Sequence, residues 1–202
     1  MHKETGSCGD YAVATLQANA NIPEGMGVDG FYHVECRDKD GNLKWEEKFP
    51  NLVVAVGKQL LLDTLLRTSG TYTTVGPFLG LTNATLTPAA TDTMTTLVGG
   101  GKEFTNYTVG GSAVRGTAVF SASTSTGSTP ANVTTASAAA ITYTITGGGG
   151  TVYGCFLVTG SGAVSTQSST AGVLYSEGNF ATAKVTTAGD TVSVTYSTTA
   201  TS

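Results

Sequence analysis

The sequence has few charged residues, no basic excess and no long apolar run. Only 12% of its 202 residues are charged, against a usual share of about 25%. The net charge of −4 gives no basic surface for phosphates or anionic lipids, so we expect no nucleic-acid partner. No run of about 18 apolar residues occurs, and the first residues include no apolar signal segment, so we expect no membrane partner and no secretion step.

Cysteine is also rare. Cys8, Cys36 and Cys155 are odd in number, far apart and in no CxxC arrangement. This pattern favours neither a disulfide framework nor a zinc site. We expect reduced thiols.

Side chains that could perform a reaction are few. His2 and His33 are the two histidines, and beyond residue 115 the charged residues are Glu177, Lys184 and Asp190. The motifs of zinc proteases, serine hydrolases and kinases are missing from the sequence. We therefore expect no enzyme, no catalytic residue, no metal ligand and no cofactor. A bound metal, or buried acids that line a cleft in the strand-rich part, would contradict this expectation.

Two loop motifs resemble ion or phosphate sites without completing them. Gly99–Lys102 has the glycines of a phosphate loop, but Glu103 stands where serine or threonine would hold magnesium. Asp38–Asn42 resembles the start of a calcium loop, but Leu43 occupies the position that requires glycine. We interpret both as turns.

The charge is concentrated at one end of the chain. Seventeen of the 24 charged residues lie within residues 1–67. The remainder is rich in threonine and glycine, with 37 and 27 of these residues in the whole chain. Threonine favours strands, because its branched Cβ suits a pleated sheet and loses rotamer freedom in a helix.

Residues 31–49 predict a β-hairpin. Apolar and polar residues alternate in 31–37 and again in 43–49, which is typical of half-buried strands. Gly41 supplies the positive φ that a tight reversal needs. Lys44, Glu46 and Lys48 should then face solvent and protect an exposed sheet edge from unwanted pairing.

A helix over about residues 52–68 follows the hairpin. Val56, Leu60, Leu61 and Leu65 recur at a helical spacing, so the helix should be amphipathic. We expect it to cover one open end of a β core. A partner subunit is the alternative cover for its apolar residues.

Residues 1–29 have little periodicity, apart from a helical turn or two that Tyr11–Gln17 allows. We interpret them as an N-terminal arm that is either mobile or ordered by a neighbouring subunit, with a disordered tail of no function as the alternative.

The rest of the chain predicts short strands between Gly- and Ser-rich turns. We expect strands at 75–81, 117–121, 141–146, 151–158, 172–175 and 191–196. Such a pattern favours a mainly β fold, an antiparallel β-sandwich of the jelly-roll or immunoglobulin-like kind over residues 30–202. Residues 122–140 predict a long surface loop, which either makes a contact or is a plain insertion. Tyr153, Tyr175 and Phe180 allow a carbohydrate-binding face, with core packing as the default.

The run FYHVECRDKDGNLKWEEKFPNLVVAVGKQLLLDTLL, residues 31–66, resembles the opening of a group of small structural proteins of tailed bacteriophages. GPFLGL, AATDTM, YGCFLV, GVLYSEGNF and GDTVSVTYS resemble later parts of the same group, so the likeness spans about residues 30–200. Members are usually called minor structural, tail fibre or head decoration proteins. The resemblance implies a virion protein and brings no catalytic residue with it.

We therefore expect a tail-associated fibre or appendage, assembled in the bacterial host cytoplasm and located in the virion. The N-terminal arm, residues 1–29, would attach it to the virion near the head–tail connector. Expected partners are a portal, adaptor, nozzle or capsid protein and further copies of this chain in a symmetric assembly, with a host-surface glycan as a further candidate ligand. A head decoration protein is the alternative, and a carbohydrate-binding module is less favoured. The residues expected at an interface are Tyr11, Leu16, Phe31, His33, Lys44, Glu46 and Lys48.

Overall fold

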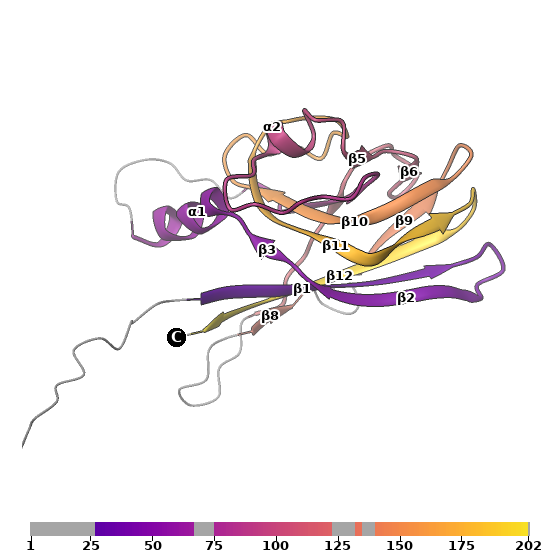
Figure 1. Cartoon of the computed structure of the whole chain (residues 1–202), viewed down its shortest axis with the longest axis horizontal. Helices are drawn as coiled ribbons and strands as arrows, with labels where there is room; N and C mark the ends of the chain where they lie inside the picture. The colour runs from indigo at the N-terminus through magenta and orange to yellow at the C-terminus, as the bar shows by residue number, and fades with distance from the viewer. Residues whose placement is uncertain (1–26, 67–74, 123–131, 135–139, 202) are drawn as a thin grey trace, which may run out of the picture.

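The computed structural model describes residues 27–66, 75–122, 132–134 and 140–201. Within these residues two six-stranded sheets pack against each other with all neighbouring strands antiparallel (Figure 1). The predicted mainly β antiparallel sandwich with a helix is confirmed.

The first sheet has the strand order β2-β1-β12-β9-β6, and β8 pairs with β12. Its strands are β1 (Gly27–Arg37), β2 (Leu43–Pro50), β6 (Tyr107–Thr108), β8 (Asn132–Thr134), β9 (Ile141–Ile145) and β12 (Thr191–Thr201). β1 and β12 are paired from end to end, from Gly27 opposite Thr201 to Arg37 opposite Thr191. The two ends of the described chain therefore lie side by side.

The second sheet has the order β3-β11-β10-β4-β5, and β7 pairs with β4. Its strands are β3 (Leu52–Val53), β4 (Phe78–Thr82), β5 (Glu103–Phe104), β7 (Gly116–Thr117), β10 (Gly150–Thr159) and β11 (Val173–Thr186). Two helices, α1 (Ala55–Leu66) and α2 (Met94–Leu97), lie in the connections of this sheet.

Buried tyrosines connect the two sheets. The Tyr143 hydroxyl on β9 donates to the Leu79 carbonyl on β4 over 2.7 Å. The Tyr32 hydroxyl on β1 lies 2.8 Å from Ser176 Oγ on β11. Each ring fills the interior while its hydroxyl finds a partner on the opposite sheet, as a buried tyrosine requires.

The first hairpin forms as the alternation predicts. Tyr32 is buried and Lys48 is exposed. In the turn, the Asp38 carboxylate accepts the backbone N–H groups of Asp40 and Asn42, both over 2.9 Å. Gly41 has φ of +87°, the left-handed conformation that glycine adopts without strain. The turn interpretation of this segment is confirmed.

The arm and the long loop have different boundaries from those predicted. β1 begins at Gly27, inside the predicted arm, because Thr199–Thr201 offer it a pairing partner. Residues 1–26 lie outside the described part of the chain. Within the predicted loop 122–140, residues 132–134 form β8.

The helix begins later than predicted, and less of its apolar surface packs against the β core than predicted. Leu52 and Val53 pair with β11 as β3, so α1 starts at Ala55. Gly57 is the one buried residue of α1, because a Cβ there would lie 2.5 Å from the Tyr175 carbonyl oxygen. α1 meets β11 through Gly57 in its first turns, and the leucines of its last turns lie outside that contact. The prediction that the apolar stripe covers the core is wrong for Leu61, Leu62, Leu65 and Leu66, which are exposed.

A buried ion pair lies beside β5. The Arg115 guanidinium contacts the Glu103 carboxylate through two hydrogen bonds of 2.8 Å, and the two side chains are 0% and 2% exposed. The Ser169 carbonyl accepts a further bond from Arg115, and the Ser168 N–H donates to Glu103. The pair therefore connects β5 to the chain before β11.

We predict that Glu103→Gln lowers the free energy of unfolding by about 3–5 kcal/mol, because it leaves a buried guanidinium without its counter-charge. Urea unfolding measures this loss. The double variant Glu103→Leu/Arg115→Met should recover most of it, since no buried charge then remains. A loss below about 1 kcal/mol for the single variant, the size expected of an exposed pair, would contradict the prediction.

Candidate functional site

Four of the predicted interface residues lie together on the outward face of β1 and β2. Phe31 and His33 on β1 share this face with Glu46 and Lys48 on β2, and His33 stands directly opposite Lys48. We call these four residues and Glu35 the hairpin face. β12, the next strand, presents serine and threonine opposite the same positions of β1, at Thr191, Ser193, Thr195 and Ser197. Ionic side chains are therefore confined to one edge of the sheet.

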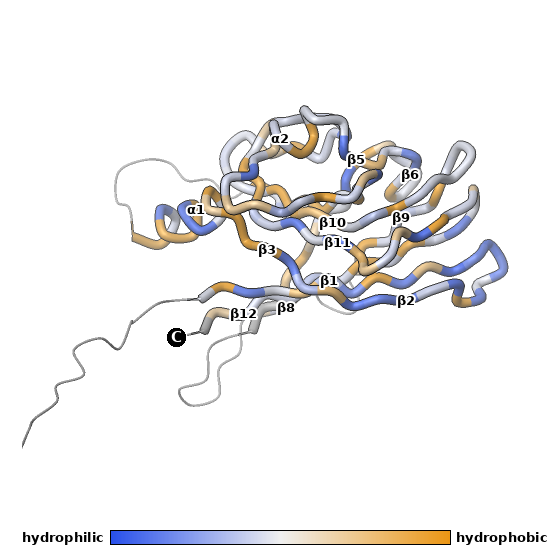
Figure 2. Tube along the Cα trace, viewed as in Figure 1, coloured by the Kyte–Doolittle hydropathy of each residue, from blue (hydrophilic) through white to orange (hydrophobic). Residues whose placement is uncertain are grey.

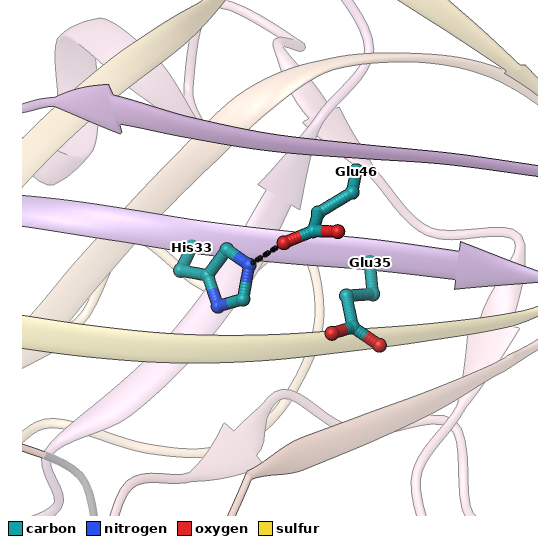
Figure 3. A group of neighbouring side chains, drawn as sticks. All are labelled: His33, Glu35 and Glu46. Atoms are coloured by element: carbon teal, nitrogen blue, oxygen red, sulfur yellow. Dashed lines mark hydrogen bonds and ion pairs between the residues drawn. The ribbon is translucent and has the colours of Figure 1, made fainter. Parts of the chain in front are cut away.

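The centre of the hairpin face is an ion-pair network (Figure 3). His33 Nε2 lies 2.7 Å from Glu46 Oε1, and Arg37 Nη2 lies 3.3 Å from Glu35 Oε2. Glu35 and Glu46 stand directly opposite each other in register, an arrangement that is unfavourable for like charges unless cations compensate. The Arg37 guanidinium compensates the charge of Glu35, and the His33 ring shares a hydrogen bond with Glu46.

The same groups could hold a metal ion. One ligand atom each from His33, Glu35 and Glu46 lies within 4.8 Å of the others, and one imidazole with two carboxylates is a donor set that zinc or manganese accepts. Each carboxylate already faces a basic side chain, so we interpret the group as a charge network. The absence of metal ligands stays a prediction.

An exposed aromatic ring adds to the hairpin face. Phe31 is 43% exposed, and the Lys48 ammonium lies 4.8 Å from the centre of its ring. A cation over a partly exposed ring is a weak contact. Aromatic and cationic side chains of this kind are available to a protein partner.

Lys44 makes an ion pair that was not predicted from the sequence. A β-bulge between Cys36 and Arg37 shifts the register, and the Lys44 ammonium forms an ion pair with the buried Asp190 carboxylate. The hydrogen bond that Lys44 donates to the Asp190 carboxylate raises the pKa of Lys44. Lys44 is exposed, as predicted, and in addition its ammonium connects the β11–β12 turn to the start of β2.

The other predicted contact residues lie elsewhere. Tyr11 and Leu16 are outside the described residues. Tyr175 and Phe180 are buried in the core, and Tyr153 is half-buried. Core packing, the default for these rings, is confirmed for Tyr175 and Phe180.

The described cysteines are free and buried. Burial raises the pKa of the Cys36 thiol to about 11 and places that of Cys155 higher still. The expectation of reduced thiols is confirmed for these two, and both lack the low pKa of a reactive cysteine.

A buried acid pair was not predicted from the sequence. Glu177 is buried and Asp92 half-buried, and their carboxyl groups line a cavity of about 30 Å³ together with Lys102 and Thr96. A cavity of this size holds a single water molecule. The acids form the kind of cluster that would count against the expectation of no enzyme, and that expectation stays a prediction.

The two acids titrate in opposite directions. Burial, aided by the hydrogen bond and charge of Asp92, raises the pKa of Glu177 to about 8. Burial also acts to raise the pKa of Asp92, but hydrogen bonds from Glu177, Ala89 and Thr96 lower it below the usual value. At neutral pH Glu177 is thus the proton donor and Asp92 the acceptor.

Comparisons with protein-family models, with curated proteins and with solved structures find no match to this chain. Among the described residues, neither helix has the length and apolar character needed to span a bilayer.

We predict that the pH dependence of stability between pH 5 and 9 is set in part by Glu177. Its pKa is raised in the folded state, so the stability gained from its proton is complete below the usual pKa of 4.5 and is lost as the pH rises through about 8. Glu177→Gln keeps a donor to Asp92 and does not ionise. The variant should therefore lose less stability than the wild type from pH 5 to 9, measured by urea unfolding at several pH values.

Asp92 does not affect this window, because its pKa is lowered and its contribution is lost only as the pH falls below the usual 3.8. Asp40→Asn, an exposed carboxylate in the first turn, is the matched control and should follow the wild-type curve. Parallel curves for the wild type and Glu177→Gln would contradict the predicted role of Glu177.

Proposed function

We propose that this chain is a structural component of a bacteriophage virion, a tail-associated fibre or appendage held near the head–tail connector. The resemblance of residues 31–66 to tailed-phage structural proteins supports the proposal. It assigns the chain no catalytic role.

The observation that carries the proposal is the contrast between a filled interior and a hairpin face that concentrates the ionic groups. The core joins both sheets through buried aromatic and aliphatic side chains. Outside, Phe31, His33, Glu46 and Lys48 form one strip beside the Ser- and Thr-bearing β12. A protein that works by holding its place in an assembly needs a stable domain and such a contact strip.

A virion component must also remain folded outside the cell. The strands of the sandwich are extensively paired, with β10 and β11 alone pairing from Gly150 opposite Thr186 to Thr159 opposite Val173. Backbone that is paired and buried opens rarely and resists proteolysis. A symmetric particle then multiplies a weak contact, because each copy adds to the avidity of the assembly.

The first test is the copy number of this chain in purified virions of the phage that encodes it, measured by quantitative mass spectrometry. A component arranged around the tail axis should be present in about 6 to 18 copies, as multiples of a cyclic symmetry. Hundreds of copies would contradict the tail assignment and favour the head decoration alternative. Absence from the particles would contradict both.

The second test is charge reversal on the hairpin face. Lys48→Glu should lower incorporation of the chain into virions several-fold, because it removes the cation beside Phe31 and adds an acid beside Glu46. Lys39→Glu makes the same charge change at the exposed hairpin turn and should leave incorporation unchanged. Equal incorporation of both variants would contradict the assignment of the contact to the hairpin face.

A further inference from the structure

The end of α1 is the most apolar exposed surface of the described chain. Leu65 and Leu66 are 79% and 70% exposed, and Leu61 and Leu62 are also exposed. In Figure 2 the free end of α1 is coloured hydrophobic, whereas the outer strand β2 is largely hydrophilic. Four exposed leucines within two helical turns are unusual for a surface that only water contacts.

A cavity of about 310 Å³ lies beside these leucines. Val28, Lys58, Leu61 and Leu62 line it. The apolar walls come from α1 and from the first residues of β1, and Lys58 contributes a positive charge. The cavity is large enough for one or two apolar side chains of a peptide.

We propose that residues 1–26 of the same chain bind this surface. The segment enters the fold at Gly27, so it meets the described structure one residue before Val28, which is itself part of the cavity wall. The eleven Cα–Cα steps from Leu16 to Gly27 can span at most about 40 Å. The segment is therefore attached at the rim of the surface that it would cover.

The chemistry of the segment matches the surface. Its sequence contains Tyr11, Val13 and Leu16, apolar residues that can fill an apolar groove. It carries one basic side chain besides His2, Lys3, against three acids, Glu4, Asp10 and Glu24. This acidic excess complements Lys58.

The size of the surface favours a segment over a second folded copy. A stable interface between two folded proteins buries about 800 Å² on each partner and involves about 20–30 residues a side. The apolar surface here is the end of one helix of 12 residues. A short peptide segment fits that area, and tethering raises its effective concentration near the surface.

The test is a photo-crosslink. A benzoylphenylalanine replacing Leu62 in the purified full-length chain should, on irradiation, form a crosslink within the monomer that mass spectrometry maps to residues 1–26. A crosslinked band at twice the mass would overturn the proposal, because it assigns the surface to a second copy. A crosslink to any other part of the same chain, or no crosslink, would also overturn it.

A pair of substitutions in the segment controls for chance proximity. Leu16→Asp should reduce the crosslink yield several-fold, since it places a charge where an apolar anchor is needed. Thr15→Asp adds the same charge next to it and should leave the yield within about twofold of the parent, as expected of a position outside the apolar set. Equal yields for both would overturn the assignment. This experiment uses the isolated chain, so its outcome is independent of the proposed place in the virion.

Discussion

The pairing of β1 with β12 is the constraint on which the rest of the fold depends. It joins the first and last described strands along their whole length. β1 positions β2 on one side, and β12 positions β8 and β9 on the other. The same pairing sets Tyr32 opposite Tyr196, with ring centres 4.8 Å apart. A slip of one residue would turn each of these rings to the solvent face, because side chains alternate along a strand. The register of this pair thus fixes both the core and the hairpin face.

Buried polar groups complete that core by pairing with one another. Arg115 donates two hydrogen bonds to Glu103, the Asp190 carboxylate pairs with the Lys44 ammonium, and Glu177 lies beside Asp92 at a shared cavity. Burial of a charge is costly unless a partner compensates it. These pairs connect turns and short strands to the long strands.

The sequence predicts the long elements because their periodicity is local. Alternation over 31–49 gives β1 and β2, and alternation at Val192, Val194 and Tyr196 gives β12. Strands of two residues such as β3, β5 and β7 have no periodicity to detect, and only the neighbouring long strands select them. The buried pair of Glu103 with Arg115 and the acid pair at Asp92 depend on how distant segments meet. For the candidate site, alternation places Phe31, His33, Glu46 and Lys48 on one face, whereas the bulge that turns Lys44 toward Asp190 leaves no signal in the pattern.

The central proposal, a place at the tail of a virion, is tested most directly by imaging. The β9–β10 turn at Gly148 is open, with no heavy atom within 4 Å of an added Cβ, so a short peptide tag inserted there should not disturb the fold. Electron microscopy of gold-labelled virions that carry the tagged chain should show label at the head–tail junction or along the tail. Label spread over the capsid surface, or particles without label, would contradict the proposal.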